Sequence, residues 1–380
     1  GILHQTYQRY PEAKKKYSEA LNIHQKYHTH DSTVYLANLY LGMLNYYSND
    51  FAQCYFYLNH AEQIFQKYKL KKNSESLFNT LGVLYFDSGN YRQSINYFTK
   101  AQDIELKNTG KKSNIALQSN LATALRHLGE NQKALEIYSN ILKENPTETR
   151  IKINLATTLL EINEPQKVFE ELKSIKIDDD IKNQISYHNI IGRVYIQQQK
   201  YEYAKKEFQE AIKDFHKSER ISKHGKNIDI GNTFKYLGDI AAQQQQWGEA
   251  MNYYQKSIFH TDTYFRDNSI YKNPTDFSAN LNNIILFNTL KAKGDCFKAM
   301  YYQKKTSKMY FKAAVDTYES AAKLSNFLLN LYDNEEARLN LTEQIYPFFS
   351  NYVGLLLEGN RQFKDPKLLE KAFILAEKSK

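Results

Sequence analysis

The stretch from Phe78 to Ala101 reads FNTLGVLYFDSGNYRQSINYFTKA, and its spacing decides the fold. Its first half places Leu81, Gly82 and Tyr85 on one helical face, and Gly89 follows where the chain must turn. The second half continues at helical spacing with Tyr91, Ser94, Phe98 and Ala101. Small residues opposite large ones let two helices approach closely. The stretch therefore predicts two antiparallel helices joined by a tight turn.

The same pattern recurs along most of the chain. Ala122 and Ala156 lie about 34 residues apart, whereas the step from Gly192 to Gly238 is longer. The small residues expected at the helix crossings are Gly42, Gly82, Ala122, Ala156, Gly192 and Gly238. A hairpin of this kind cannot bury its apolar face alone, so consecutive hairpins must stack.

With this period, residues 1 to about 260 resemble the tetratricopeptide-repeat family. The resemblance implies an all-α fold, a right-handed α-α superhelix of about seven helical hairpins followed by a degenerate helical region. It also implies that the first helix of each hairpin lines a concave groove that binds a peptide or protein. The 31 tyrosines and 21 phenylalanines are expected mainly to fill the core and the grooves between helices.

The pattern loosens beyond Asn273-Pro274. We expect the repeat array, with an incomplete first repeat, to cover residues 1–275. Degenerate repeat-like helices are expected over 276–365, and a helix over 366–380 would lead to a further domain. The helices expected here span 278–293, 297–307, 311–332, 336–358 with a kink or break at Pro347, and 366–380.

Residues 311–380 resemble the helices that precede the caspase-like CHAT peptidase domain in bacterial repeat-plus-CHAT proteins. Leu368–Phe373 and Ala376–Lys380 carry most of this resemblance. It implies that the chain is the sensing or regulatory part of a larger effector protein. The domain after Lys380 would hold a histidine and a cysteine, and no catalytic residue transfers to this chain, for which we expect no enzyme activity.

Composition leaves two alternatives to the regulatory scaffold. The net charge of +9 permits an acidic partner or nucleic acid, but the lysines lie along nearly every helix, often near glutamates, which favours solvated faces. A stand-alone adaptor and a nucleic-acid binder therefore stay open. No apolar run approaches the roughly 20 residues that span a bilayer. Cys54 and Cys296 fit buried positions and a reducing compartment, so we expect a cytoplasmic protein; an exported one with its signal peptide removed is the alternative.

Few residues suggest chemistry. His28, His30 and Asp31 have a spacing that a metal could use, but no fourth ligand is near, and a polar loop between helices is favoured. Asp178–Asp180 is expected to cap the helix that follows it. There is no glycine-rich phosphate loop, so no cofactor and no metal are predicted.

A ligand in the groove would meet side chains that the first helices turn inward. Val83 and Thr123 stand at or next to places where the family's carboxylate clamp has asparagines, which argues against chaperone-tail binding. The mixed charges instead predict a polar partner segment. The candidate groove residues are Asn79, Asp87, Arg126, His127, Glu161, Asn189, Arg193, Lys235 and Asp239.

Overall fold

A computed structural model describes most of the chain. Its described residues form 17 α-helices and include no strand, which confirms the all-α prediction. The chain divides into two compact units, Gly1–Ile137 and Tyr138–Lys380. The described residues are 10–27, 31–48, 50–68, 70, 73–110, 114–175, 180–219, 226–277, 284–303, 307–331 and 335–378.

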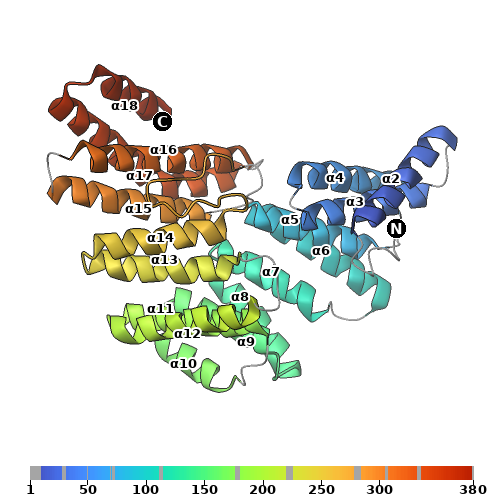
Figure 1. Cartoon of the computed structure of the whole chain (residues 1–380). Helices are drawn as coiled ribbons and strands as arrows, with labels where there is room; N and C mark the ends of the chain where they lie inside the picture. The colour runs from blue at the N-terminus through green and yellow to red at the C-terminus, as the bar shows by residue number, and fades with distance from the viewer. Residues whose placement is uncertain are drawn as a thin grey trace. The chain divides into compact units, whose positions relative to one another are not determined.

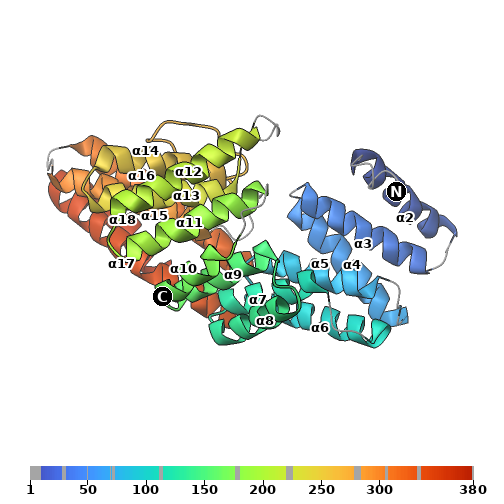
Figure 2. The ribbon, with the colours of Figure 1, turned by 90° about the horizontal axis from the view of Figure 1, so that it is seen from below.

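The first unit consists of consecutive helices that pack as antiparallel pairs (Figures 1 and 2). Pairs form between α3 and α4 and between α5 and α6, while α2 packs on α3 and α7 packs on α6. The division between the units falls within α8 (Asn131–Glu144). The helices before it are α2 (Tyr10–Tyr27), α3 (Asp31–Tyr47), α4 (Phe51–Tyr68), α5 (Ser74–Asp87), α6 (Tyr91–Thr109) and α7 (Ile115–His127).

The second unit continues the same arrangement, and Figure 1 shows α13 to α16 side by side in chain order. Each odd-numbered helix from α9 to α17 packs on the even-numbered helix after it. Its helices are α9 (Thr149–Glu161), α10 (Pro165–Lys173), α11 (Ile181–Gln197), α12 (Tyr201–Glu219), α13 (Ile228–Gln243), α14 (Trp247–Thr261), α15 (Ile284–Gln303), α16 (Lys308–Leu331), α17 (Glu335–Phe363) and α18 (Pro366–Lys378).

The predicted crossing of a small residue and a large one is present in the hairpins. A Cβ atom on Gly82 would lie 2.5 Å from the ring of Phe98, and one on Gly192 would lie 2.4 Å from the ring of Phe208. Both rings are buried. Only a residue without a side chain lets the two helix backbones come this close, so the glycines fix the helix spacing.

The turns between paired helices place one residue in the left-handed region. Gly89 and Gly129 have φ of 80° and 87°, as expected for glycine. At the same place in later hairpins stand Asn163, Gln199 and Gln245, with φ of 61°, 58° and 60°. Glycine therefore identifies the early turns, whereas the later turns keep the same geometry at a cost in backbone strain.

The C-terminal helices correct two predictions. The helix break expected between residues 293 and 297 is wrong, because α15 is continuous through Gly294, where a Cβ would lie 2.4 Å from Tyr318. This glycine repeats the crossing of the earlier hairpins and is not a helix end. Of the two alternatives at Pro347, the break is wrong, since α17 continues through the proline and buries the next residue, Phe348. Tertiary packing of that apolar face offsets the lost backbone hydrogen bond. The kink stays a prediction.

The connection between α14 and α15 is held by a buried lysine. Residues 262–277 form no helix. The ammonium of Lys293 on α15 donates hydrogen bonds to Lys272 O at 3.0 Å, Asn273 Oδ1 at 2.9 Å and Gln255 Oε1 at 2.6 Å. Ser320 Oγ donates to Pro274 O at 2.6 Å. The predicted domain boundary after residue 275 lies in this connection, inside the second unit, and stays a prediction.

Candidate ligand-binding surface

The candidate residues of α5 hold neighbouring helices in place. Asn79 is half-buried and accepts a hydrogen bond from Asn120 Nδ2 on α7 at 3.2 Å. Asp87 ends α5 and accepts from the hydroxyl of Tyr46 on α3. Both side chains thus join consecutive first helices, so part of their hydrogen-bonding capacity is used within the fold.

Arg126 and His127 end α7, next to each other. Arg126 Nη2 lies 3.0 Å from His127 Nε2. The imidazole also contacts two aromatic rings, with centroid distances of 5.0 Å to Phe86 and 4.9 Å to Tyr91. His127 is exposed as a residue, but its ring packs against the preceding hairpin.

Two candidates of the second unit line neither of the cavities that its described residues form at residues 139–174 and 193–243. Glu161 is exposed at the end of α9. Asn189 on α11 is buried, donates to Asp229 O at 3.1 Å and accepts from Thr233 Oγ1 at 2.8 Å. Its amide links α11 to α13, so Asn189 has a structural role in positioning these first helices.

The remaining three candidates come together where α11 and α13 pack side by side. The ring centroid of Tyr236 lies 5.8 Å from Arg193 Cζ and 5.9 Å from Lys235 Nζ. Asp239 is paired with Lys235 at 2.7 Å. Beside them is a cavity of about 240 Å³. Its lining residues are Arg193, Ile196, Gln197, Tyr236, Asp239, Ile240 and Gln243.

The charged side chains at this cavity differ in whether they have a partner of opposite charge. Both carboxylate oxygens of Asp239 have partners, since Oδ2 lies 2.7 Å from Lys235 Nζ and Oδ1 accepts from Tyr254 OH at 2.9 Å. Burial, together with Asp239, raises the pKa of Tyr254, so this phenol stays a donor. Arg193 has no carboxylate partner among the described residues. The cavity therefore presents one uncompensated cation beside an aromatic ring.

Tyr236 was missed by the sequence reasoning. The sequence places it beside Lys235, but 31 tyrosines gave no means to separate this one from those that fill the core. In the structure its ring stacks on Phe208 of α12 at a centroid distance of 5.5 Å. That contact holds the ring at the cavity wall. Because the contact joins two hairpins, the pattern within one repeat carries no signal for it.

The other sequence features are structural where they are described. Cys54 and Cys296 are buried thiols, as predicted, and burial raises the pKa of each to about 12. Asp180 caps α11 by accepting from Lys182 N at 2.9 Å. His28, His30, Asp178 and Asp179 lie outside the described residues. Among the residues that are described, no group of three or more His, Cys, Asp or Glu side chains could hold a metal.

Comparison with protein families identifies the repeating unit. Residues 73–143 and residues 185–213 each match a family model described as a tetratricopeptide repeat. These two segments are tetratricopeptide repeats. The first covers α5 to α7 and most of α8, and the second covers most of α11 and α12. The crossings Gly82–Phe98 and Gly192–Phe208 lie within them. No curated protein matches the sequence.

Solved structures share the fold at low sequence identity. The apo form of the quorum sensor NprR from B. thuringiensis has a TM-score of 0.52 and 14% identity, over 99% of this chain and 100% of that one. NprR in complex with its cognate peptide NprX has a TM-score of 0.52 and 15% identity, over 88% and 97% of the two chains. The likeness confirms a tetratricopeptide-repeat fold. No described helix is both long and apolar enough to cross a membrane.

Proposed function

We propose that this chain is a scaffold that binds a peptide or protein segment in the groove formed by its first helices, with the cavity at Arg193 as the anchoring point. The uncompensated guanidinium beside Tyr236 carries the proposal. A ligand carboxylate would form a bidentate pair with Arg193. Apolar atoms of the ligand would pack against Ile196 and Ile240 in the same cavity.

The neighbouring helices support this assignment. Tyr236 is held by Phe208, and Asp239 is paired with Lys235 and accepts a hydrogen bond from Tyr254, so neither side chain must reorganise to admit a ligand. A preformed site loses less entropy on binding. The NprR structure with NprX shows that a protein of this fold, though only 15% identical, is found with a peptide bound.

Ion pairing within helices favours a protein ligand over nucleic acid. Many lysines face a glutamate one turn away, as in the pairs Lys16–Glu19 and Lys213–Glu210, each at 2.8 Å. Such pairs are typical of solvated helix faces and leave less unpaired charge for phosphates. The nucleic-acid hypothesis is therefore the less favoured one. A strongly salt-dependent affinity for oligonucleotides would support it.

The regulatory role is a separate part of the proposal. It rests on the resemblance of residues 311–380 to the helices that precede a CHAT peptidase domain. Under it, ligand binding to the repeats would control an effector domain encoded after Lys380. Reading the gene downstream tests it: a domain with a histidine and a cysteine is expected, and a stop codon directly after Lys380 would leave the stand-alone adaptor.

Replacing Arg193 tests the binding site. Peptides selected from a random displayed library on the wild-type protein should carry a carboxylate, and their affinity should fall about tenfold to a hundredfold in Arg193→Ala, because a charge-assisted hydrogen bond is lost. Arg193→Lys should recover only part of the affinity, since lysine cannot form the bidentate pair. Fluorescence anisotropy gives the dissociation constants.

The matched control is Arg361→Ala, which removes an exposed arginine at the end of α17. Its affinity for the selected peptides should equal that of the wild type, and both variants should melt within a few degrees of it. Selected peptides that bind Arg193→Ala as tightly as the wild type would show that the ligand lies elsewhere.

A further inference from the structure

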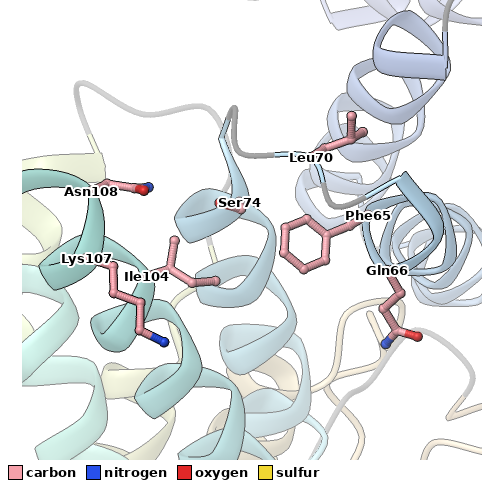
Figure 3. Close-up of a pocket in the computed structure, with 7 residues that line it drawn as sticks. All are labelled: Phe65, Gln66, Leu70, Ser74, Ile104, Lys107 and Asn108. Atoms are coloured by element: carbon pink, nitrogen blue, oxygen red, sulfur yellow. The ribbon is translucent and has the colours of Figure 1, made fainter.

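The first unit contains a cavity of its own, formed mainly by the second helices of two hairpins. Phe65 and Gln66 come from the last turn of α4, and Ile104 and Lys107 come from the end of α6. Its volume is about 240 Å³. The complete lining is Phe65, Gln66, Leu70, Ser74, Ile104, Lys107 and Asn108 (Figure 3).

The middle of this cavity is apolar. Figure 3 shows the ring of Phe65 and the side chain of Ile104 directed toward each other from α4 and α6, with Ser74 of α5 between the two helices. Phe65 is backed by the fully buried Phe78, at a ring-centroid distance of 5.0 Å. Packing therefore holds the two apolar side chains apart. Water is excluded from the gap between them only when a third apolar group enters it.

The border of the cavity is basic. Lys107 is exposed and has no acidic partner within the part of the chain that the structure describes. Lys67, in the last turn of α4, belongs to the adjoining segment 67–72, which reads KYKLKK, and Lys107 begins the segment 107–112, which reads KNTGKK. Of these lysines, Lys67 and Lys107 belong to the described part of the chain, and Lys107 lines the cavity.

We propose that this cavity docks an acidic segment of a partner protein. One aliphatic side chain of the segment inserts between Phe65 and Ile104, and a carboxylate one or two residues away pairs with Lys107. The apolar contact and the charge pair act together, because each partner residue alone would gain little at a half-exposed surface. The site belongs to second helices of the first unit, so it is independent of the Arg193 cavity.

The dimensions favour a side chain over a whole small molecule. Pockets for cofactors and drug-sized ligands enclose about 300 to 1,000 Å³, which is more than this cavity holds. An aliphatic side chain needs less room and leaves its backbone outside, where an acidic neighbour can reach Lys107. The positive charge of Lys107 favours a segment that carries glutamate or aspartate, by charge complementarity.

Binding of designed peptides tests the proposal. The probe is a fluorescently labelled peptide of glutamate and glycine with one central leucine, and the second probe replaces the leucine by serine. The leucine peptide should bind the intact chain, and Lys107→Glu and Ile104→Ser should each weaken binding about fivefold or more. Lys133→Glu on α8, an exposed lysine outside the cavity, is the matched control and should bind as the wild type does.

The combination of peptide and variant separates the explanations. In Ile104→Ser the advantage of the leucine peptide over the serine peptide should shrink, because the leucine keeps its contact with Phe65 but loses the one with Ile104. The proposal is overturned if the leucine peptide does not bind the wild type, or if Lys133→Glu weakens it as much as Lys107→Glu does. It is also overturned if a single-stranded oligonucleotide of equal charge binds as tightly and loses affinity in Lys107→Glu, which would assign the site to nucleic acid.

Discussion

Wild-type protein should gain about 3 kcal/mol of stability relative to Lys293→Met when the pH is raised from about 7 to about 10. Lys293 is fully buried, and its ammonium is surrounded by three neutral oxygens, from Gln255, Lys272 and Asn273. Burial lowers its pKa to about 7, against a weaker opposing effect of Asp267. Folding therefore favours the uncharged amine.

The sign of this change in stability follows from the number of protons that each state binds. The unfolded chain holds the Lys293 proton up to about pH 10.5, whereas the folded chain releases it near pH 7. Between these values the unfolded state binds more protons, so stability rises with pH. Below about pH 7 both states are protonated, and the full cost of the buried charge is present. Methionine cannot titrate, so the variant lacks this rise.

Denaturant unfolding followed by tryptophan fluorescence measures the effect. Trp247 is the single tryptophan of the chain and packs in the same apolar cluster as α15, so it reports on the second unit. The comparison ends near pH 10, above which buried phenols such as Tyr254 and Tyr318, whose pKa values are raised, destabilise the folded state of both proteins.

The matched control is Lys272→Met, which removes an exposed lysine of the same connection but keeps its backbone carbonyl. Its stability should follow the wild type at every pH. Parallel curves for wild type and Lys293→Met would contradict the burial of this amine. They would mean that water reaches Lys293 in solution.

Local patterns explain why most of the hairpins could be predicted. Gly42 and Leu58, like Gly82 and Phe98, stand at the same spacing along the chain and meet at the crossing. This signal is local, since both residues of each pair lie in one hairpin. The signal is weaker where the spacing changes, because Gly294 meets Tyr318 across longer helices. The predicted helix break therefore falls at Gly294, the residue at which α15 packs closely against α16.

The candidate surface was predicted less completely, for a physical reason. Helical periodicity shows which side chains point away from the core, but it cannot show which charged side chains form ion pairs. Asp239 is paired with Lys235 one turn away, whereas Arg193 has no such partner among the described side chains. Only the three-dimensional structure distinguishes these two cases. The cavity at Phe65 and Ile104 involves two hairpins, so no single repeat contains its pattern.

The helix crossing in the repeat at residues 185–213 should show strong coupling between Gly192 and Phe208. Phe208→Ala should cost about 3 to 5 kcal/mol, because the fully buried ring leaves a cavity. Gly192→Ala should cost about 1 to 3 kcal/mol, because its Cβ would lie 2.4 Å from that ring and force α11 and α12 apart. Urea unfolding followed by Trp247 fluorescence measures both.

The double variant decides whether the close approach is the cause. With the ring gone, the Cβ that Gly192→Ala adds would enter space that Phe208 left, so the combined cost should be smaller than the sum by about 1 kcal/mol or more. Gly354→Ala is the matched control, since its Cβ would meet nothing within 4 Å in the middle of α17. It should stabilise the protein by up to about 1 kcal/mol through helix propensity alone. Additive costs at Gly192 and Phe208 would mean that the helix spacing of this repeat is set by other contacts.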